Sequence, residues 1–153
     1  MRETAAAYDR AGSSVKEGVT MGEENTVLFS LAGMTFEYDA LKERANIKKH
    51  GISFRTAARV FFDDDYIEEY DEAHSDNETR YQVIGDVSAG YAKLFTAIGN
   101  AEGFLDGAED ILYVVYTERT KRFSEGKTVE VVRLISARLA NSFERGLYYG
   151  QYL

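Results

Sequence analysis

The second half of the chain contains two consecutive runs that are typical of buried β-strands, ILYVVYT at Ile111–Thr117 and TVEVVRLIS at Thr128–Ser136. Both runs are rich in β-branched and aromatic residues. The polar segment Lys121–Lys127 between them contains a glycine and predicts a turn. Strands joined by a short turn pair in the antiparallel direction. We therefore expect these two runs to form the centre of an antiparallel sheet.

Further elements are predicted on either side of this strand pair. The run RYQVIGDV at Arg80–Val87 alternates as a strand does, and Ala137–Tyr149 has apolar residues at the spacing of a helix. The segment Ser88–Asp110 is rich in glycine and alanine, and it is compatible with either a helix or an extra hairpin.

Capping residues predict two helices earlier in the chain. Asp39 follows a strand-like entry segment and is an N-cap residue, Gly51 provides a stop after His50, and Ser53 can cap a second helix. We therefore expect an α+β fold, with N-terminal helices followed by a mainly antiparallel sheet and a C-terminal helix. Residues 1–33 are expected to be a loosely ordered N-terminal extension, and residues 34–153 to be a single domain.

Composition limits the classes of function. The chain has 153 residues and no cysteine, which excludes disulfides, cysteine-based zinc sites and cysteine nucleophiles. No apolar run approaches the ~18 residues that span a membrane, and the N-terminal segment lacks the apolar core of a signal peptide. We therefore expect a soluble, cytoplasmic protein.

The charge is unevenly distributed along the chain. The formal charge of −8 and the isoelectric point near 4.8 argue against broad nucleic-acid binding. However, Asp63–Glu78 holds nine of the acidic residues and no Lys or Arg, so most of the excess is local. The sequence still permits a local positive site, because two basic clusters remain: Lys42–Lys49 with Arg55 and Arg59, and Arg119–Lys127 with Arg133, Arg138 and Arg145.

No common catalytic or cofactor motif occurs. The chain lacks the loops GxGxxG and GxxxxGK[ST], the G-x-S-x-G elbow and HExxH, so we expect no cofactor and no metal site. Basic residues at predicted strand and helix ends are more suggestive, because strand ends of an antiparallel sheet can converge on one rim. These residues are Lys49, His50, Arg80, Arg119, Arg133 and Arg138.

A convergent basic cluster suits an anionic ligand, since arginine binds phosphate through paired hydrogen bonds. RNA cleavage without a metal needs a base for the 2′-hydroxyl proton, cations for the phosphorane and an acid for the leaving 5′-oxygen. His50, or a carboxylate such as Glu118, could serve as the base. The alternative is that these residues are ordinary exposed side chains at the ends of elements.

Six short blocks occur in a fixed order from Met34 onward, and together they make a specific pattern. They are Phe36–Asp39 with Lys42 and Asn46; Lys49–Phe54 with Ala57, Val60 and Phe61; His74–Asp76 with Glu78 and Arg80; Ile84–Gly85; Val114–Arg119; and Arg133–Ala140 with Glu144, Arg145 and Tyr148. In these blocks the chain resembles the BrnT family, the RelE-like ribonuclease toxins of bacterial type II toxin–antitoxin systems.

The resemblance implies a compact RelE-like fold and a metal-independent endoribonuclease that inhibits translation. It also implies a complex with a BrnA-like antitoxin, and this complex binds operator DNA only through the antitoxin. By position, it assigns Arg80 and Arg138 to the scissile phosphate, and His50 or Glu118 to proton transfer. Contacts to further RNA phosphates are assigned to Lys49, Arg119 and Arg133.

Three features depart from the family pattern. Residues 1–33 precede the usual start, Ser88–Asp110 is longer than the expected turn, and Leu139 stands where the family usually has a basic residue. The alternative function is therefore a catalytically weakened or inactive toxin-like protein that acts as a protein-binding module. The acidic stretch Asp63–Glu78 either mimics nucleic acid or docks a basic antitoxin segment, or it is simply a solvated loop.

Overall fold

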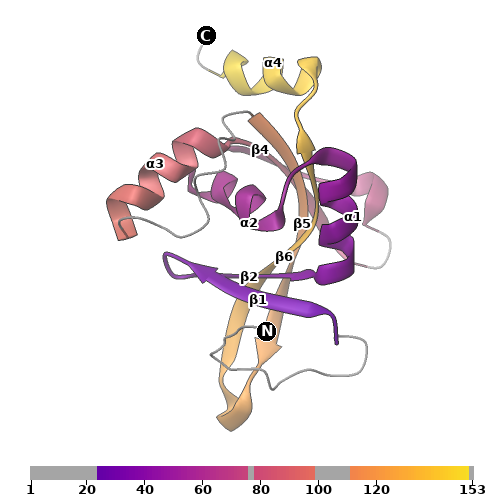
Figure 1. Ribbon diagram of the computed structural model, residues 1–153, viewed down its shortest axis with the longest axis vertical. Coiled ribbons are helices and arrows are strands. Elements are labelled where there is room, and N and C mark those ends of the chain that lie inside the picture. Colours follow the sequence, from indigo (N-terminus) through magenta and orange to yellow (C-terminus); the bar gives the residue numbers. More distant parts are fainter. Residues whose placement is uncertain (1–23, 76–77, 99–110, 152–153) are drawn as a thin grey trace.

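One sheet with helices packed around it forms the part of the chain that the computed structural model describes, residues 24–75, 78–98 and 111–151 (Figure 1). The six strands are ordered β1-β2-β6-β5-β4-β3. They are β1 (Thr26–Leu31), β2 (Met34–Asp39), β3 (Ile67–Tyr70), β4 (Arg80–Asp86), β5 (Ile111–Arg122) and β6 (Thr128–Leu139). The helices are α1 (Ala40–His50), α2 (Phe54–Ala57), α3 (Val87–Ile98) and α4 (Ser142–Gly150), with 3₁₀ turns η1 (Ala58–Phe62), η2 (Glu72–His74) and η3 (Ser124–Gly126). The class is α+β, as predicted.

The arrangement of the sheet differs from the prediction in two ways. The sheet is mixed and not mainly antiparallel, because Thr35, Phe36 and Glu37 of β2 pair with β6 in the parallel direction. The helices are not N-terminal, because β1 and β2 form an antiparallel pair that precedes α1. Local patterns predict pairing only between strands that follow one another, whereas β2 and β6 lie near opposite ends of the described chain.

The two apolar runs do form a central ladder. β5 and β6 are each 12 residues long and pair antiparallel. Figure 1 shows this ladder running along the length of the molecule, from α4 at the top to the hairpin tip at the bottom. A register shift between Val115 and Tyr116 lets both Leu134 and Ala137 of β6 enter the same core.

The C-terminal helix begins later than predicted. Residues 137–139 belong to β6, and α4 starts only at Ser142. The reason is a capping box at this point. The Asn141 side chain accepts a hydrogen bond from the backbone N–H of Glu144 at 2.8 Å, and the Glu144 carboxylate accepts from the N–H of Asn141 at 2.9 Å.

The predicted caps of the first two helices are confirmed. The Asp39 carboxylate accepts hydrogen bonds from two backbone N–H groups in the first turn of α1. Gly51 ends this helix with a φ of 75°, a left-handed conformation that favours glycine. The Ser53 hydroxyl accepts from the backbone N–H of Thr56 at 3.1 Å and caps α2.

Part of the segment predicted to be an N-terminal extension forms strand β1. Thr26–Leu31 pairs with β2 over its whole length, and Phe29 stacks on Phe36 with ring centroids 5.2 Å apart. The rest of that segment, residues 1–23, lies outside the described residues. Among the helices in the described ranges, none is long and apolar enough to cross a membrane.

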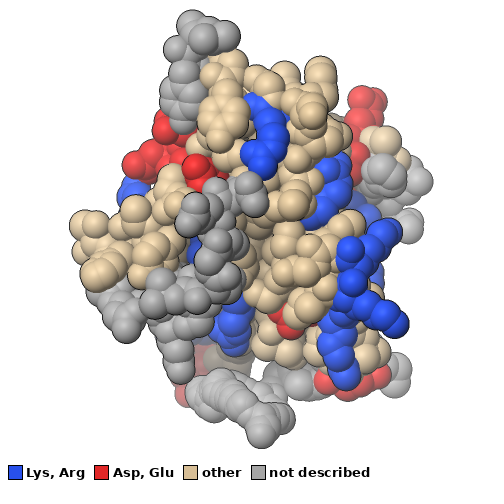
Figure 2. Space-filling model, turned by 45° about the horizontal axis from the view of Figure 1, so that its top comes forward, with Lys and Arg blue, Asp and Glu red and all other residues tan. Residues whose placement is uncertain are grey.

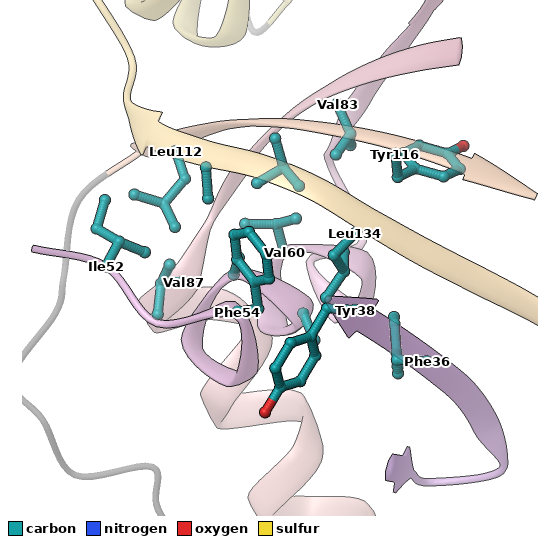
Figure 3. Close-up of a cluster of buried hydrophobic side chains, with 14 of the residues drawn as sticks. Phe36, Tyr38, Ile52, Phe54, Val60, Val83, Val87, Leu112, Tyr116 and Leu134 are labelled. Atoms are coloured by element: carbon teal, nitrogen blue, oxygen red, sulfur yellow. The ribbon is translucent and has the colours of Figure 1, made fainter. Parts of the chain in front are cut away.

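The main hydrophobic core lies between one face of the sheet and the α2–η1 segment. Figure 3 shows Phe54 and Val60 from this segment packed under Leu112 and Leu134 of the two central strands. We call this side of the sheet the helical face. Side chains alternate along a strand, so the residues between these core positions point to the opposite face.

Helix α4 covers one end of the opposite face. Tyr148 packs there with Ile84, Ile111 and Ala140, and its hydroxyl donates to the buried carboxylate of Asp63 at 2.6 Å. The remainder of the opposite face carries polar and charged side chains, among them Glu37, Arg119 and Arg133.

The segment Ser88–Asp110 was compatible with a helix or a hairpin, and up to residue 98 it forms helix α3. Residues 99–110 lie outside the described residues. Helix α3 packs on η1 at Gly90, where a Cβ atom would lie only 1.9 Å from the carbonyl oxygen of Arg59. Leu94, one turn later, is fully buried. A residue without a side chain is therefore required at the contact between the two backbones.

We predict that Gly90→Ala lowers the free energy of unfolding by about 1–3 kcal/mol, because the added methyl group would push α3 away from η1. The matched control is Gly146→Ala in α4, where nothing lies within 4 Å of the added Cβ. There, the higher helix propensity of alanine should leave stability unchanged or raise it by about 0.5–1 kcal/mol. Urea unfolding measures both values, and equal effects of the two substitutions would contradict this packing.

Candidate active site

A completely buried glutamate lies on the opposite face of the sheet. Glu37 of β2 is 0% exposed. It stands between the core residues Phe36 and Tyr38, so its side chain points away from the helical face. An isolated carboxylate in such a position would be strongly unfavourable, and its charge must be compensated by neighbours.

Three basic side chains surround the Glu37 carboxylate. Lys121 Nζ lies 2.7 Å from Oε1, Arg133 Nη1 lies 2.8 Å from Oε2, and Arg119 Nη1 lies 3.6 Å from Oε2. Arg119 and Lys121 alternate on β5 and so share one face, while Arg133 comes from β6. The side chains of Lys121 and Arg133 are each only 15% exposed, which limits screening of these pairs by solvent.

Arg119 connects this group to a second carboxylate that is nearer the surface. Arg119 Nη2 lies 3.3 Å from Glu78 Oε1, and Arg80 Nη2 lies 3.4 Å from Glu78 Oε2. We call these six residues the cationic cluster: Glu37, Glu78, Arg80, Arg119, Lys121 and Arg133. Its four basic side chains outnumber its two carboxylates, so the cluster suits an anionic ligand.

An open pocket of about 330 Å³ adjoins the cationic cluster. It lies where β5 continues beyond the first residue of β4. The Thr117 hydroxyl donates to the carbonyl oxygen of Thr79 and so ties the segment before β4 to β5. The pocket is lined by Glu78, Thr79, Tyr81, Thr117, Glu118 and Arg119. Its lining residues therefore carry a guanidinium group, two carboxylates, three hydroxyl groups and an aromatic ring.

Glu118 brings an exposed carboxylate to this pocket from the helical side of β5. It lies opposite Val132 in the β5–β6 ladder, and Val132 packs against the core on this side. Burial, and then the negative charge of Glu118, raises the pKa of Glu68 on the edge strand β3. Glu68 also accepts a hydrogen bond from the Tyr116 hydroxyl. Glu118 thus interacts electrostatically with a second carboxylate beside the pocket.

Arg138 lies away from the cationic cluster, beside α4. Its Nη1 and Nη2 donate to Glu144 Oε1 and Oε2 at 2.8 Å and 2.9 Å, and its guanidinium lies 4.0 Å from the centre of the Tyr113 ring. The hydrogen bonds from Arg138 are the largest cause that lowers the pKa of Glu144. Arg138 pairs with Tyr113 and Arg80 with Thr117, so these two arginines are about 13 Å apart along β5.

Lys49 and His50 end α1, on the side of β6 that does not face β5. Helix α1 is fixed there by Asn46, whose side chain donates to the carbonyl oxygen of Ala137 at 2.9 Å and accepts from its N–H at 3.1 Å. His50 follows Asn46 by about one helical turn, and Arg138 follows Ala137 directly. This contact therefore places Lys49 and His50 toward the same end of β6 as Arg138.

The exposed surface of α1 is basic. Figure 2 shows Lys and Arg side chains gathered along the right-hand side of the molecule, where α1 lies in Figure 1. The exposed basic residues of α1 are Lys42, Arg44, Lys48 and Lys49. Two members of the same sequence cluster lie elsewhere: Arg59 is only 1% exposed, and the Arg55 guanidinium lies over the Phe29 ring.

The residues predicted from the sequence therefore fall into two groups. The first comprises the cationic cluster and its pocket, with Arg80, Arg119, Arg133 and Glu118. The second, toward the C-terminal end of β6, comprises Lys49, His50 and Arg138. Within the described residues, no group of three or more His, Asp or Glu side chains could hold a metal ion.

Six residues of the first group were not predicted as site residues from the sequence: Glu37, Glu78, Thr79, Tyr81, Thr117 and Lys121. Two signals could have found some of them. Glu37 is an acidic residue between two aromatic residues of a predicted strand, which indicates a compensated charge. Lys121 follows Arg119 by two residues, and this is the spacing of one strand face.

We predict that Glu37→Gln lowers the free energy of unfolding by about 3–5 kcal/mol, because Lys121 and Arg133 would remain mostly buried without a compensating charge. Glu130→Gln, at an exposed position of β6, is the matched control and should change stability by less than about 0.5 kcal/mol. Urea unfolding measures both. If Glu37→Gln were as mild as the control, the cluster would not depend on Glu37.

A pH-dependent difference is expected for Glu144→Gln. The pKa of Glu144 is lowered in the folded protein, so its charge stabilises the fold above the unfolded pKa of about 4.3, and this stability is lost as the pH falls through the lower folded value. At pH 7 the variant should lose about 1–3 kcal/mol through its weaker bonds to Arg138. Unfolding measured from pH 7 to pH 2.5 should show wild type and variant converging in acid, and a constant gap would contradict the ion pair.

Comparison with known proteins bears on part of this site. Residues 38–101 match the family of the ribonuclease toxin BrnT of type II toxin–antitoxin systems. The match covers less than half of the chain; it includes Lys49, His50 and Arg80 and ends before β5. No curated protein matches the chain. The resemblance found in the sequence is thereby confirmed, and over residues 38–101 the chain carries the signature of the BrnT ribonuclease toxins.

Proposed function

We propose that this protein is the toxin of a type II toxin–antitoxin pair, a metal-independent endoribonuclease that inhibits translation in the cytoplasm. One observation carries the proposal: four basic side chains, three of them around the buried Glu37, lie beside a pocket that contains Glu118. The match to ribonuclease toxins supports the choice of RNA among anionic polymers.

The scissile phosphate would bind to Arg80 and Arg119, the two arginines that now share Glu78. Their contacts with Glu78, at 3.4 Å and 3.3 Å, are longer than the ~2.7–2.9 Å of strong charge-assisted hydrogen bonds, so a phosphate can compete for the same groups. Arg133 is mostly buried on Glu37, and it would act mainly by raising the local positive potential.

Apart from one proton taken from solvent, the reaction requires only groups that the first group of residues offers. Glu118 would remove the proton of the 2′-hydroxyl, and the 2′-oxygen would then attack the phosphorus atom. Arg80 and Arg119 would stabilise the extra negative charge of the phosphorane. The 5′-oxygen would leave with a proton from solvent, so that the products are a 2′,3′-cyclic phosphate and a 5′-hydroxyl end.

Glu118 is a better candidate than His50 for the proton transfer. Glu118 lines the pocket together with Arg119, whereas His50 lies toward the Arg138 end of β6. We propose that Lys49, His50 and Arg138 instead contact the flanking RNA backbone, together with the exposed basic side chains of α1. Arg138 would do so once a phosphate competes with Glu144.

An antitoxin is the expected partner, because the matched family belongs to type II toxin–antitoxin systems. We propose that it is a BrnA-like protein that covers the cationic cluster. In the complex, the antitoxin and not this protein would bind operator DNA. The second candidate function is a catalytically weakened or inactive toxin-like protein. It is favoured by Leu139, which is 50% exposed and adds no charge beside Arg138.

The deciding experiment is RNA cleavage by the purified, antitoxin-free protein in EDTA. Wild-type protein is expected to cut a labelled transcript and to leave 5′-hydroxyl ends. Arg119→Ala should lower kcat/KM by about 10²–10³-fold through loss of transition-state stabilisation. Glu118→Gln should lower kcat by about 10²–10⁴-fold, because the 2′-hydroxyl would lose its general base.

Arg122→Ala is the matched control, because Arg122 is exposed on the same strand as Arg119 but belongs neither to the pocket lining nor to the cationic cluster. It should retain wild-type activity, and thermal melting should show that all variants are folded. Equal activity of Arg119→Ala and Arg122→Ala would remove the pocket from the reaction. If wild type cut neither free RNA nor message in a translation extract, the protein-binding alternative would replace the enzyme.

A further inference from the structure

The pocket beside Arg119 contains more than a phosphate requires. A free phosphate or a bare backbone would use the Arg119 guanidinium and the Thr79 hydroxyl. It would make little use of Tyr81, which also lines the pocket and packs against the core on the helical face. The pocket is open and has a volume of about 330 Å³.

The ring of Tyr81 is held rigidly by other aromatic residues. It stacks on Tyr116 with centroids 5.4 Å apart and planes inclined by 27°. Tyr116 in turn contacts Phe61 edge to face at 5.0 Å. Tyr70 on the edge strand β3 meets the Tyr81 ring at 6.2 Å and is 55% exposed, so it extends the aromatic surface outward. A rigid aromatic surface of this kind is what nucleobases stack on.

The charges around the pocket favour a ligand with a single negative charge. Glu118, added to the cationic cluster, leaves an excess of only one positive charge among these ionised groups. A phosphodiester carries one negative charge, whereas a nucleoside triphosphate would bring several of them close to Glu78 and Glu118. The balance of charge therefore fits one nucleotide within a chain better than a free nucleoside triphosphate.

We propose that this pocket is a subsite for one nucleotide of a phosphodiester, with the phosphate at Arg119 and the base stacked on Tyr81. The assignment rests on the proposed function, which identifies the polymer as RNA. It adds that the protein binds one nucleotide of this RNA next to the cleaved bond. Tyr81 is then a binding residue with a role separate from that of Glu118.

Binding of two uncleavable probes tests this assignment. A 2′-deoxy dinucleotide has one diester and two bases and lacks the attacking hydroxyl, whereas dimethyl phosphate has the same charge and no base. NMR titration of wild type should show the dinucleotide binding at least about 10-fold more tightly than dimethyl phosphate. Tyr81→Leu should weaken dinucleotide binding by about 5- to 100-fold and leave dimethyl phosphate unchanged.

Two further variants separate stacking from folding. Tyr81→Phe keeps the ring and should bind both probes as wild type does, which shows that the hydroxyl is not needed. Tyr149→Leu removes a tyrosine that is 53% exposed on α4, and it should also behave as wild type. Thermal melting of Tyr81→Leu establishes that the loss of binding is measured on folded protein.

The outcomes distinguish the subsite from the proposed function. Similar affinities of wild type for the two probes, or wild-type dinucleotide binding by Tyr81→Leu, would overturn the subsite even if the protein cuts RNA. Conversely, binding that depends on Tyr81 in a protein that fails to cut RNA would keep the subsite and reject the nuclease.

Discussion

The ion pairs of Glu37 are the interaction on which the arrangement of this protein depends. A fully buried carboxylate is tolerated only because Lys121, Arg133 and Arg119 neutralise it. These partners come from β5 and β6, whereas Glu37 belongs to β2, so the pairs span the parallel junction between β2 and β6. A slip of β2 by one residue would turn Glu37 into the hydrophobic core, and the charge therefore helps to specify the register.

The two faces of the sheet divide stability from ligand binding. The helical face buries aromatic and aliphatic side chains against α2 and η1 and supplies most of the hydrophobic stabilisation. Helix α4 covers only one end of the opposite face, where it engages Arg138 through Glu144. On the rest of that face Glu37 and its partners Lys121 and Arg133 are mostly buried, while Arg80 and Arg119 lie nearer to solvent. The proposed phosphate and nucleotide sites thus stand on long paired strands, which are more rigid supports than loops.

Predictions from sequence succeeded where the cause is local. Asp39, Gly51 and Ser53 mark helix ends through hydrogen bonds or backbone angles within a few residues, and each is observed as predicted. The start of α4 was misplaced, because the apolar spacing across residues 137–149 suits both the end of a strand and a helix. The capping box at Asn141 resolves this ambiguity. The parallel pairing of β2 with β6 had no local signal at all.

The residue pattern alone established the α+β class, the central strand pair and a set of basic residues at the ends of elements. It also established the resemblance to ribonuclease toxins that the family match supports. Which of those basic residues lie together was decided by the tertiary fold. Arg80, Arg119 and Arg133 meet because β4, β5 and β6 are neighbours in register, and Arg138 is held apart by its position on the same ladder. This proximity depends on pairing between strands that are distant in the sequence and on the burial of Glu37. Local sequence patterns predict neither of them.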